Sequence, residues 1–374
     1  MAPTPVIPSA RGPAPIERPR SPPVGNAPRF GSDVIADTLR ELLPGSGHLV
    51  HMPAHIYARV GRYHDSVIAN QKAIVADDSY LAICKPGPGT YPLGYVPHNH
   101  HFLWFAATME GAGEIARVAA VHTGERTSDP QLMRTPGFEA MQNFSLTPLF
   151  AAVRFGRWDE ITAMAKPGDD VPYMQAMWNY AQAMAAVSQG RLDDAKAFHA
   201  APVPATSDPT IEKMLAWDRY SLIGGVQVAE RFVAAEIARA EKKYDEAIAA
   251  LNTAVTIEDT LPYDEPPAWN WPSRLALGNV LLQAGKAAEA EQVFRDELTR
   301  NPDAMISALQ KISTNSVVAA PADASSESRN SSNDRRWTFI RHSSPFSGST
   351  SSTRDSRPCA PCRSPANACS TPSR

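Results

Sequence analysis

The sequence predicts an all-α protein, an α-solenoid of about six helix–turn–helix units with disordered segments at both ends. Apolar residues recur at helical spacing through residues 33–315, as at Ala229, Phe232, Val233 and Ile237. No segment alternates convincingly between apolar and polar residues, as a half-buried strand would. A turn signal recurs along the chain at a comparable phase, which indicates internal repeats.

The clearest unit spans residues 274–302 and contains, at regular spacing, Gly278, Leu281, Gly285, Ala290, Phe294 and Pro302. This pattern matches the tetratricopeptide repeat, a helix–turn–helix of about 34 residues. The small residues let its two helices approach closely, Gly285 makes the tight turn, and Pro302 ends the second helix.

Weaker copies of this frame surround Gly61, Gly111, Gly156, Gly190 and Tyr244. Because the register is shared, the aromatic side chains that follow the turns are predicted to belong to the repeat core; they are Tyr63, Trp158 and Tyr244. The six units together predict the α-solenoid.

The two ends of the chain have a different composition. Residues 1–32 are rich in proline and lack the apolar stretch of a secretory signal, so we expect a disordered leader. Residues 316–374 are rich in serine and arginine and are expected to form a low-complexity tail, including the isolated Cys359–Cys362 pair. With four cysteines in all, a disulfide-rich secreted domain is excluded, and the cytoplasm is the expected location.

Charge and motifs exclude several function classes. The 36 Lys and Arg residues against 39 Asp and Glu give a net charge of -3, which argues against a strongly basic nucleic-acid binder. No apolar run of about 18 residues occurs, so no membrane partner is expected. The chain also contains no GxGxxG, P-loop, GxSxG or HExxH motif. Nothing in the sequence specifies an oligomeric state.

Two histidine clusters stand out, one with His48, His51 and His55 and the other with His98 and His101. When Gly61 and Gly111 are aligned as repeat turns, both clusters fall at positions that face the concave groove of a tetratricopeptide repeat. The i,i+4 and i,i+3 spacings place two imidazoles on one helical face. Pro53 lies inside the first cluster, so the helix is expected to begin near Met52, with His48 and His51 before it.

Such pairs on neighbouring helices could bind Zn, Cu, Ni or Fe through His51, His55, His98 and His101. His48 is a possible additional groove residue. Glu110 and Glu265 are candidate carboxylate partners, either of which could act as a base toward a metal-activated water. The alternative is that groove histidines form ordinary hydrogen bonds with a bound peptide.

Three other segments could contact the two histidine clusters. Asp77 and Asp78 are expected to cap a helix or face solvent. The insertion at residues 79–97, with Tyr91 and Tyr95, could form a lid. The proline-rich loop Tyr263 to Pro272, which carries Glu265, is expected to be structural, with closure over the groove as the alternative.

The strings GHLVHMPAHIYARVGRY, YVPHNHHFLWFAATMEG and PYDEPPAW, with the last repeat, resemble a bacterial family of tetratricopeptide repeat proteins. That family is related to eukaryotic tetratricopeptide repeat protein 38, and the resemblance covers residues 34–303. It implies an α-solenoid with paired groove histidines, here His51, His55, His98 and His101, and no established activity. Typical relatives are longer at both ends, which implies a truncated or frame-disrupted member.

Two functions follow from this interpretation. The first is a binding or scaffold protein whose concave groove takes a protein or peptide partner. The second is a metal-binding protein or metal-dependent enzyme that uses the groove histidines. The predicted architecture alone favours the first function, because a fold without an identified catalytic site does not imply a reaction. The histidine pattern favours the second.

Overall fold

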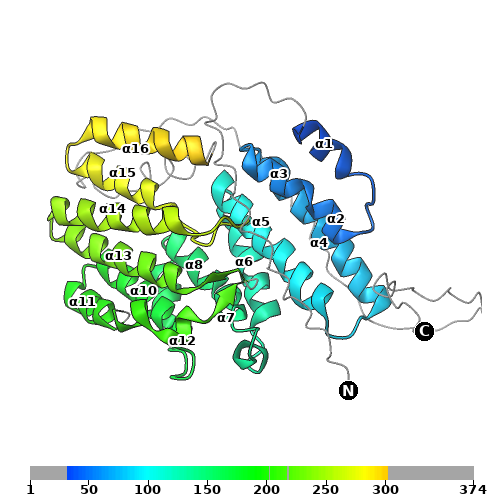
Figure 1. The fold of residues 1–374 in the computed structure, drawn as a ribbon, viewed down its shortest axis with the longest axis horizontal. Helices are drawn as coiled ribbons and strands as arrows, with labels where there is room; N and C mark the ends of the chain where they lie inside the picture. Colours follow the sequence, from blue (N-terminus) through cyan, green and yellow to red (C-terminus); the bar gives the residue numbers. More distant parts are fainter. Residues whose placement is uncertain (1–31, 202, 217–218, 302–374) are drawn as a thin grey trace, which may run out of the picture. The chain divides into compact units, whose positions relative to one another are not determined.

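The computed structural model describes residues 32–301 except 202, 217 and 218 (Figure 1). The predicted leader, apart from residue 32, and the predicted tail at residues 316–374 lie outside the described residues. The described chain is mostly helical, as the sequence predicts.

The helices, in chain order, are α1 (Ser32–Leu39), α2 (Gly47–His51), α3 (Pro53–Arg59), α4 (Tyr63–Cys84), α5 (Val96–Glu110), α6 (Gly113–Thr127), α7 (Met141–Ser145), α8 (Thr147–Arg154), α9 (Trp158–Ala163), α10 (Pro172–Ser188), α11 (Leu192–Ala200), α12 (Pro209–Glu212), α13 (Ile223–Ala240), α14 (Tyr244–Thr260), α15 (Ser273–Gln283) and α16 (Ala287–Arg300). Shorter helical turns are η1 (Tyr91–Tyr95), η2 (Leu132–Arg134) and η3 (Pro204–Ser207).

Strand structure within the described residues is limited to β1 (Leu215–Ala216) and β2 (Tyr220–Ser221), which pair antiparallel. Leu215 lies opposite Ser221, and Ala216 lies opposite Tyr220. The sequence did not predict this pair, because two residues are too few to show a period of two.

Consecutive helices pack as antiparallel pairs, joined by six tight turns. The paired helices are α3 with α4, α5 with α6, α8 with α9, α10 with α11, α13 with α14, and α15 with α16. Figure 1 shows α13, α14, α15 and α16 lying side by side in chain order. Each pair therefore contacts mainly its neighbours along the chain.

All six turns share one backbone conformation. The turn residue has φ between 61° and 87° in each case: Gly61, Gly111, Gly156, Gly190, Lys242 and Gly285. The next residue donates its N–H to the carbonyl five residues before it, as from Arg62 to Tyr57 at 2.8 Å and from Lys286 to Leu281 at 2.9 Å. This bond satisfies a carbonyl that the end of the first helix would otherwise leave unpaired.

The second helix of every pair has an acidic residue in its first turn, which favours a helix start at that point. These residues are Asp65, Glu114, Asp159, Glu160, Asp193, Asp194, Asp245, Glu246 and Glu289. In each pair, the turn residue ends the first helix and the acidic residues after it favour the start of the second helix.

Small residues allow the helices to pack closely, as the repeat pattern predicts. A Cβ atom on Gly278 would lie 2.3 Å from the ring of Phe294, on the second helix of the same pair. Tyr63 is buried, while Trp158 and Tyr244 are partly buried against the core. The predicted core positions therefore lie between helices.

Gly47 is the close-packing glycine nearest the histidines. A Cβ atom here would lie 1.9 Å from Oδ1 of Asp77 and 2.8 Å from the backbone oxygen of Ala73, both on α4. Only a residue without a side chain lets α2 pack this closely on α4.

We expect Gly47→Ala to lower the free energy of unfolding by about 1–3 kcal/mol, because the added methyl group overlaps α4. Urea denaturation followed by circular dichroism at 222 nm measures this loss. Gly45→Ala is the matched control, since a Cβ there meets nothing within 4 Å, and it should change stability by less than about 0.5 kcal/mol. Equal stability of the two variants would contradict the proposed close approach.

Candidate functional site

The first histidine cluster lies on two helices that are nearly continuous. Met52, between α2 and α3, has the right-handed helical φ of −50° and ψ of −37°, and Pro53 occupies the first turn of α3. The expectation that a helix begins near Met52 is confirmed for α3, and His48 and His51 before it lie on a short helix of their own, α2. Proline in a first helical turn costs no hydrogen bond, so the break leaves the histidines on adjoining turns.

Three imidazoles converge at one point. Nε2 of His51 lies 2.8 Å from Nε2 of His55 and 3.0 Å from Nε2 of His98, which comes from α5. The three candidate ligand atoms all lie within 4.8 Å of one another. The structure thus brings together three of the four histidines predicted to bind a metal.

Asn70 on α4 orients the first of these rings. Its Nδ2 donates to the backbone oxygen of Ser66 at 2.8 Å, so its Oδ1 faces Nδ1 of His51 at 2.7 Å and accepts a hydrogen bond from it. His51 therefore carries its proton on Nδ1. Its Nε2 has a lone pair that points at the other two rings.

Glu265 orients the second ring. Its Oε2 accepts a hydrogen bond from Nδ1 of His55 at 2.5 Å, and its Oε1 lies 3.9 Å from Nε of Arg59. The loop between α14 and α15 supplies Glu265, so a residue 210 positions away completes the site. The contact places Glu265 beside the histidine cluster, so the loop reaches the histidine face.

The arrangement has an electrostatic consequence. With Nδ1 protonated on His51 and His55, each neutral ring presents a lone pair on Nε2, and two such lone pairs repel at 2.8 Å. A single proton can be shared between only two of the three nitrogens. A cation among the three Nε2 atoms would accept a lone pair from each of them.

Burial keeps two of these imidazoles, His51 and His98, neutral. Desolvation lowers the pKa of His51 to about 3 and moves the pKa of His98 well below its ordinary value. The neutral imidazole is the form that binds transition metals. Burial therefore favours the ligating form.

The remaining predicted residues lie outside this cluster. His48 packs on Tyr95, with ring centroids 4.1 Å apart, and its Nδ1 is not within the converging group. His101 packs against Trp104 and Phe144, with ring centroids at 5.1 Å and 5.0 Å.

His101 and Glu110 require a correction to the predicted site. A step of three residues rotates a side chain about 60° around the helix axis, so His101 leaves the direction of His98. Glu110 lies about 18 Å further along the same helix, and it pairs with the exposed His64 at 2.7 Å. Neither residue belongs to the three-histidine cluster.

A buried polar network beside His48 escaped the sequence analysis. Asp77 is fully buried and accepts hydrogen bonds from the hydroxyl of Tyr91 and from Nδ2 of Asn99, each at 2.7 Å. The expectation that Asp77 caps a helix or faces solvent is therefore wrong. The network fixes η1 against α4 and α5, so Tyr91 and Tyr95 lie beside His48. Opening of this segment as a lid stays a prediction.

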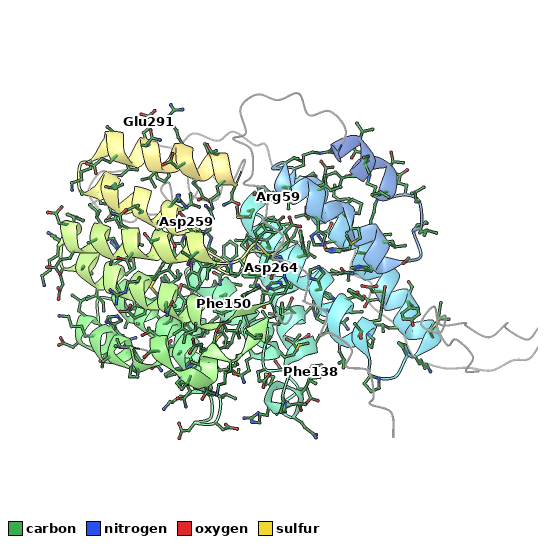
Figure 2. All side chains as sticks on the ribbon, viewed as in Figure 1. Arg59, Phe138, Phe150, Asp259, Asp264 and Glu291 are labelled. Atoms are coloured by element: carbon green, nitrogen blue, oxygen red, sulfur yellow. The ribbon has the colours of Figure 1, made fainter. Side chains whose placement is uncertain are left out.

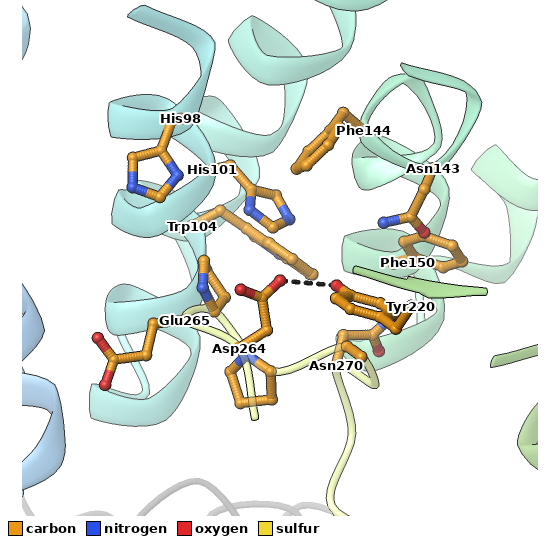
Figure 3. Close-up of a pocket in the computed structure, with 13 residues that line it drawn as sticks. His98, His101, Trp104, Asn143, Phe144, Phe150, Tyr220, Asp264, Glu265 and Asn270 are labelled. Atoms are coloured by element: carbon orange, nitrogen blue, oxygen red, sulfur yellow. Dashed lines mark hydrogen bonds between the residues drawn. The ribbon is translucent and has the colours of Figure 1, made fainter. Parts of the chain in front are cut away.

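A pocket adjoins the cluster (Figure 3). His98 and Glu265 line it on one side, and His101, Trp104, Tyr220 and Asp264 line it further in. It encloses about 410 Å³, including the solvent at its mouth. The loop that provides Glu265 also brings Asp264 among the packed helices (Figure 2). The cluster and the pocket share one histidine and one carboxylate.

Comparison of the chain with protein-family models, with curated proteins and with solved structures gave no match. The resemblance to the tetratricopeptide repeat family therefore stays a prediction. Within the described residues, no helix has the length and apolar character needed to cross a membrane.

We predict that acid destabilises the protein through its buried histidines. His51, His100 and His101 have folded-state pKa values of about 3, against 6.5 for an exposed imidazole. The unfolded chain then binds more protons below pH 6.5, so the free energy of unfolding falls as the pH falls from 6.5 toward 3.

His101→Leu should reduce this slope by up to about 1.4 kcal/mol per pH unit near pH 5, and by about half of that at pH 6.5, because one uncompensated imidazole is removed. Urea titrations of the metal-free protein at several pH values between 5 and 7.5 measure the slope. His64→Gln, at a largely exposed position, is the control. An unchanged slope for His101→Leu would contradict the burial of a neutral imidazole at this position.

Proposed function

We propose that the chain is a metal-binding protein, an α-solenoid of about six tetratricopeptide-like helix pairs with a metal centre on His51, His55 and His98. The observation that carries this proposal is the convergence of three Nε2 atoms, two of which, on His51 and His55, have their lone pairs directed inward by Asn70 and Glu265. Peptide recognition would not need neighbours that direct two lone pairs at a third imidazole.

The donor set suits a first-row transition metal. Neutral imidazole binds Zn, Cu, Ni and Fe, and we favour zinc because three protein ligands with an open fourth position are typical of catalytic zinc sites. Tetrahedral zinc with bonds of about 2.05 Å would require the nitrogens to lie about 3.3 Å apart. The nitrogen contacts of 2.8 Å and 3.0 Å would need to lengthen by only a few tenths of an ångström.

The surroundings favour chemistry over a purely structural metal. His98 and Glu265 line the pocket, so a ligand there would lie beside the metal centre. A bound zinc ion would supply Lewis acidity and an acidified water. Glu265 would orient His55 and contribute a carboxylate at the pocket wall. We therefore propose a water-activating, hydrolytic type of reaction on a small molecule.

The scaffold function stays the second candidate. A groove that takes a peptide needs an open face, and the contact between Glu265 and His55 shows that the chain's own loop already lies against part of this face. Binding of a protein elsewhere in the groove stays a prediction.

Elemental analysis of the purified full-length protein tests the metal centre. We expect close to one equivalent of transition metal per chain, lost in His51→Ala/His98→Ala. The control His64→Ala/His101→Ala also removes two imidazoles but should retain the metal. Folded wild-type protein that contains no metal and binds no added zinc would refute the proposal, and equal loss in both variants would refute the assignment of ligands.

A second test separates the two carboxylates named from the sequence. Glu265→Gln should weaken zinc affinity about 10-fold to 100-fold, because the amide oxygen is a weaker acceptor for Nδ1 of His55. Glu110→Gln makes the same chemical change at the far end of α5 and should leave affinity unchanged. Competition titration against a chromogenic chelator measures both values. Equal effects would show that Glu265 does not orient the ligand.

A further inference from the structure

The pocket beside the histidine cluster has a distinct charge pattern. Two carboxylates line it, Asp264 and Glu265, and none of its described lining residues is Lys or Arg. The buried His101 is held neutral by desolvation. The fixed charge at the pocket wall is therefore negative.

Asp264 has only partial compensation for its charge. The hydroxyl of Tyr220 donates to it at 2.6 Å and the backbone of Glu265 also hydrogen-bonds it, while the nearest guanidinium nitrogen, on Arg219, lies 4.0 Å away. Burial raises the pKa of this carboxyl, which shows that the folded chain under-stabilises the carboxylate. A cation bound beside Asp264 would supply the missing stabilisation.

Two buried polar atoms, on residues that line the pocket, have no hydrogen-bond partner among the described residues. They are Nδ1 of His101 and Nε1 of Trp104, in side chains that are both more than nine-tenths buried. Figure 3 shows the His101 ring and the Asp264 carboxylate turned toward the same space. An indole N–H can only donate, so Trp104 requires an acceptor, whereas His101 can accept a hydrogen bond. Buried polar atoms normally have partners, so both point to a missing ligand.

The other walls are apolar and aromatic. Phe144 and Phe150 line the pocket with Trp104 and Tyr220, and Pro266 and Pro267 form the loop side. Aromatic faces stabilise organic cations and bury apolar groups. The walls would therefore favour a ligand with an apolar body over a simple inorganic ion.

We propose that this pocket binds a small primary amine with an apolar body and an oxygen acceptor next to the amine. The ammonium group would pair with Asp264 and donate to Nδ1 of His101, and the oxygen would accept from Nε1 of Trp104. This inference deepens the proposed function by naming the class of molecule placed beside the metal. Its binding step does not require the metal.

Isothermal titration calorimetry of the full-length, EDTA-treated protein tests the proposal with four matched probes. The probe 2-amino-1-phenylethanol has all three features. In turn, 2-phenylethylamine lacks the oxygen, 1-phenylethanol lacks the amine, and mandelate replaces the ammonium arm with an anion. We expect the first probe to bind at least tenfold more tightly than 1-phenylethanol, several-fold more tightly than 2-phenylethylamine, and mandelate not to bind.

Two variants locate the contacts. Asp264→Asn keeps an acceptor for Tyr220 but removes the charge, and should weaken amine binding at least tenfold while leaving 1-phenylethanol unchanged. Asp193→Asn makes the same change at an exposed position on α11 and is the control. Trp104→Phe should abolish the difference between 2-amino-1-phenylethanol and 2-phenylethylamine. Preference for the alcohol or the anion, or no effect of Asp264→Asn, would overturn the proposal.

The metal-centre proposal and the amine-pocket proposal can be refuted independently. Amine binding to a protein that takes up no zinc would refute the metal centre and support the amine pocket. Zinc binding by a protein that ignores all four probes would support the metal centre and overturn the amine pocket.

Discussion

The fold depends on one repeated backbone constraint, the left-handed turn that closes each helix pair. The residue with positive φ reverses the chain, and the hydrogen bond across the turn satisfies the end of the first helix. Because glycine adopts this conformation without steric cost, five of the six turns use it, and Lys242 takes the sixth place. Helix pairs placed in this way bring distant segments side by side.

The histidine site follows from this placement. The turn at Gly61 folds α4 back on α2 and α3, so Asn70 reaches His51. The packing of α4 on α5 then brings His98 to the same point. Bringing three imidazole nitrogens this close costs free energy unless a proton or a cation lies between them. The absence of a side chain on Gly47 and the buried network at Asp77 hold these helices close enough for that contact.

The loop between α14 and α15 links the cluster to the pocket. Glu265 faces His55, while its neighbour Asp264 faces Tyr220, so adjacent carboxylates serve two different environments. Glu265 accepts a hydrogen bond from an imidazole N–H and lies near an arginine. Asp264 is half-buried and accepts hydrogen bonds from the Tyr220 hydroxyl and the Glu265 backbone. A metal centre and an organic ligand would thus share one wall without competing for the same carboxylate.

The sequence by itself predicted the helical class and the glycine turns at Gly61, Gly111, Gly156, Gly190 and Gly285, because glycine placement and helical spacing are local properties. It also singled out His51, His55, His98 and Glu265 as candidates. It could not separate His101 and Glu110 from the cluster, since repeat register fixes a face only coarsely and 60° of rotation redirects a side chain. No sequence motif marks Asn70, Asp77 or the two pocket nitrogens without partners as members of a site. Only the packing of α2, α4 and α5 and the path of the loop decided which polar groups meet.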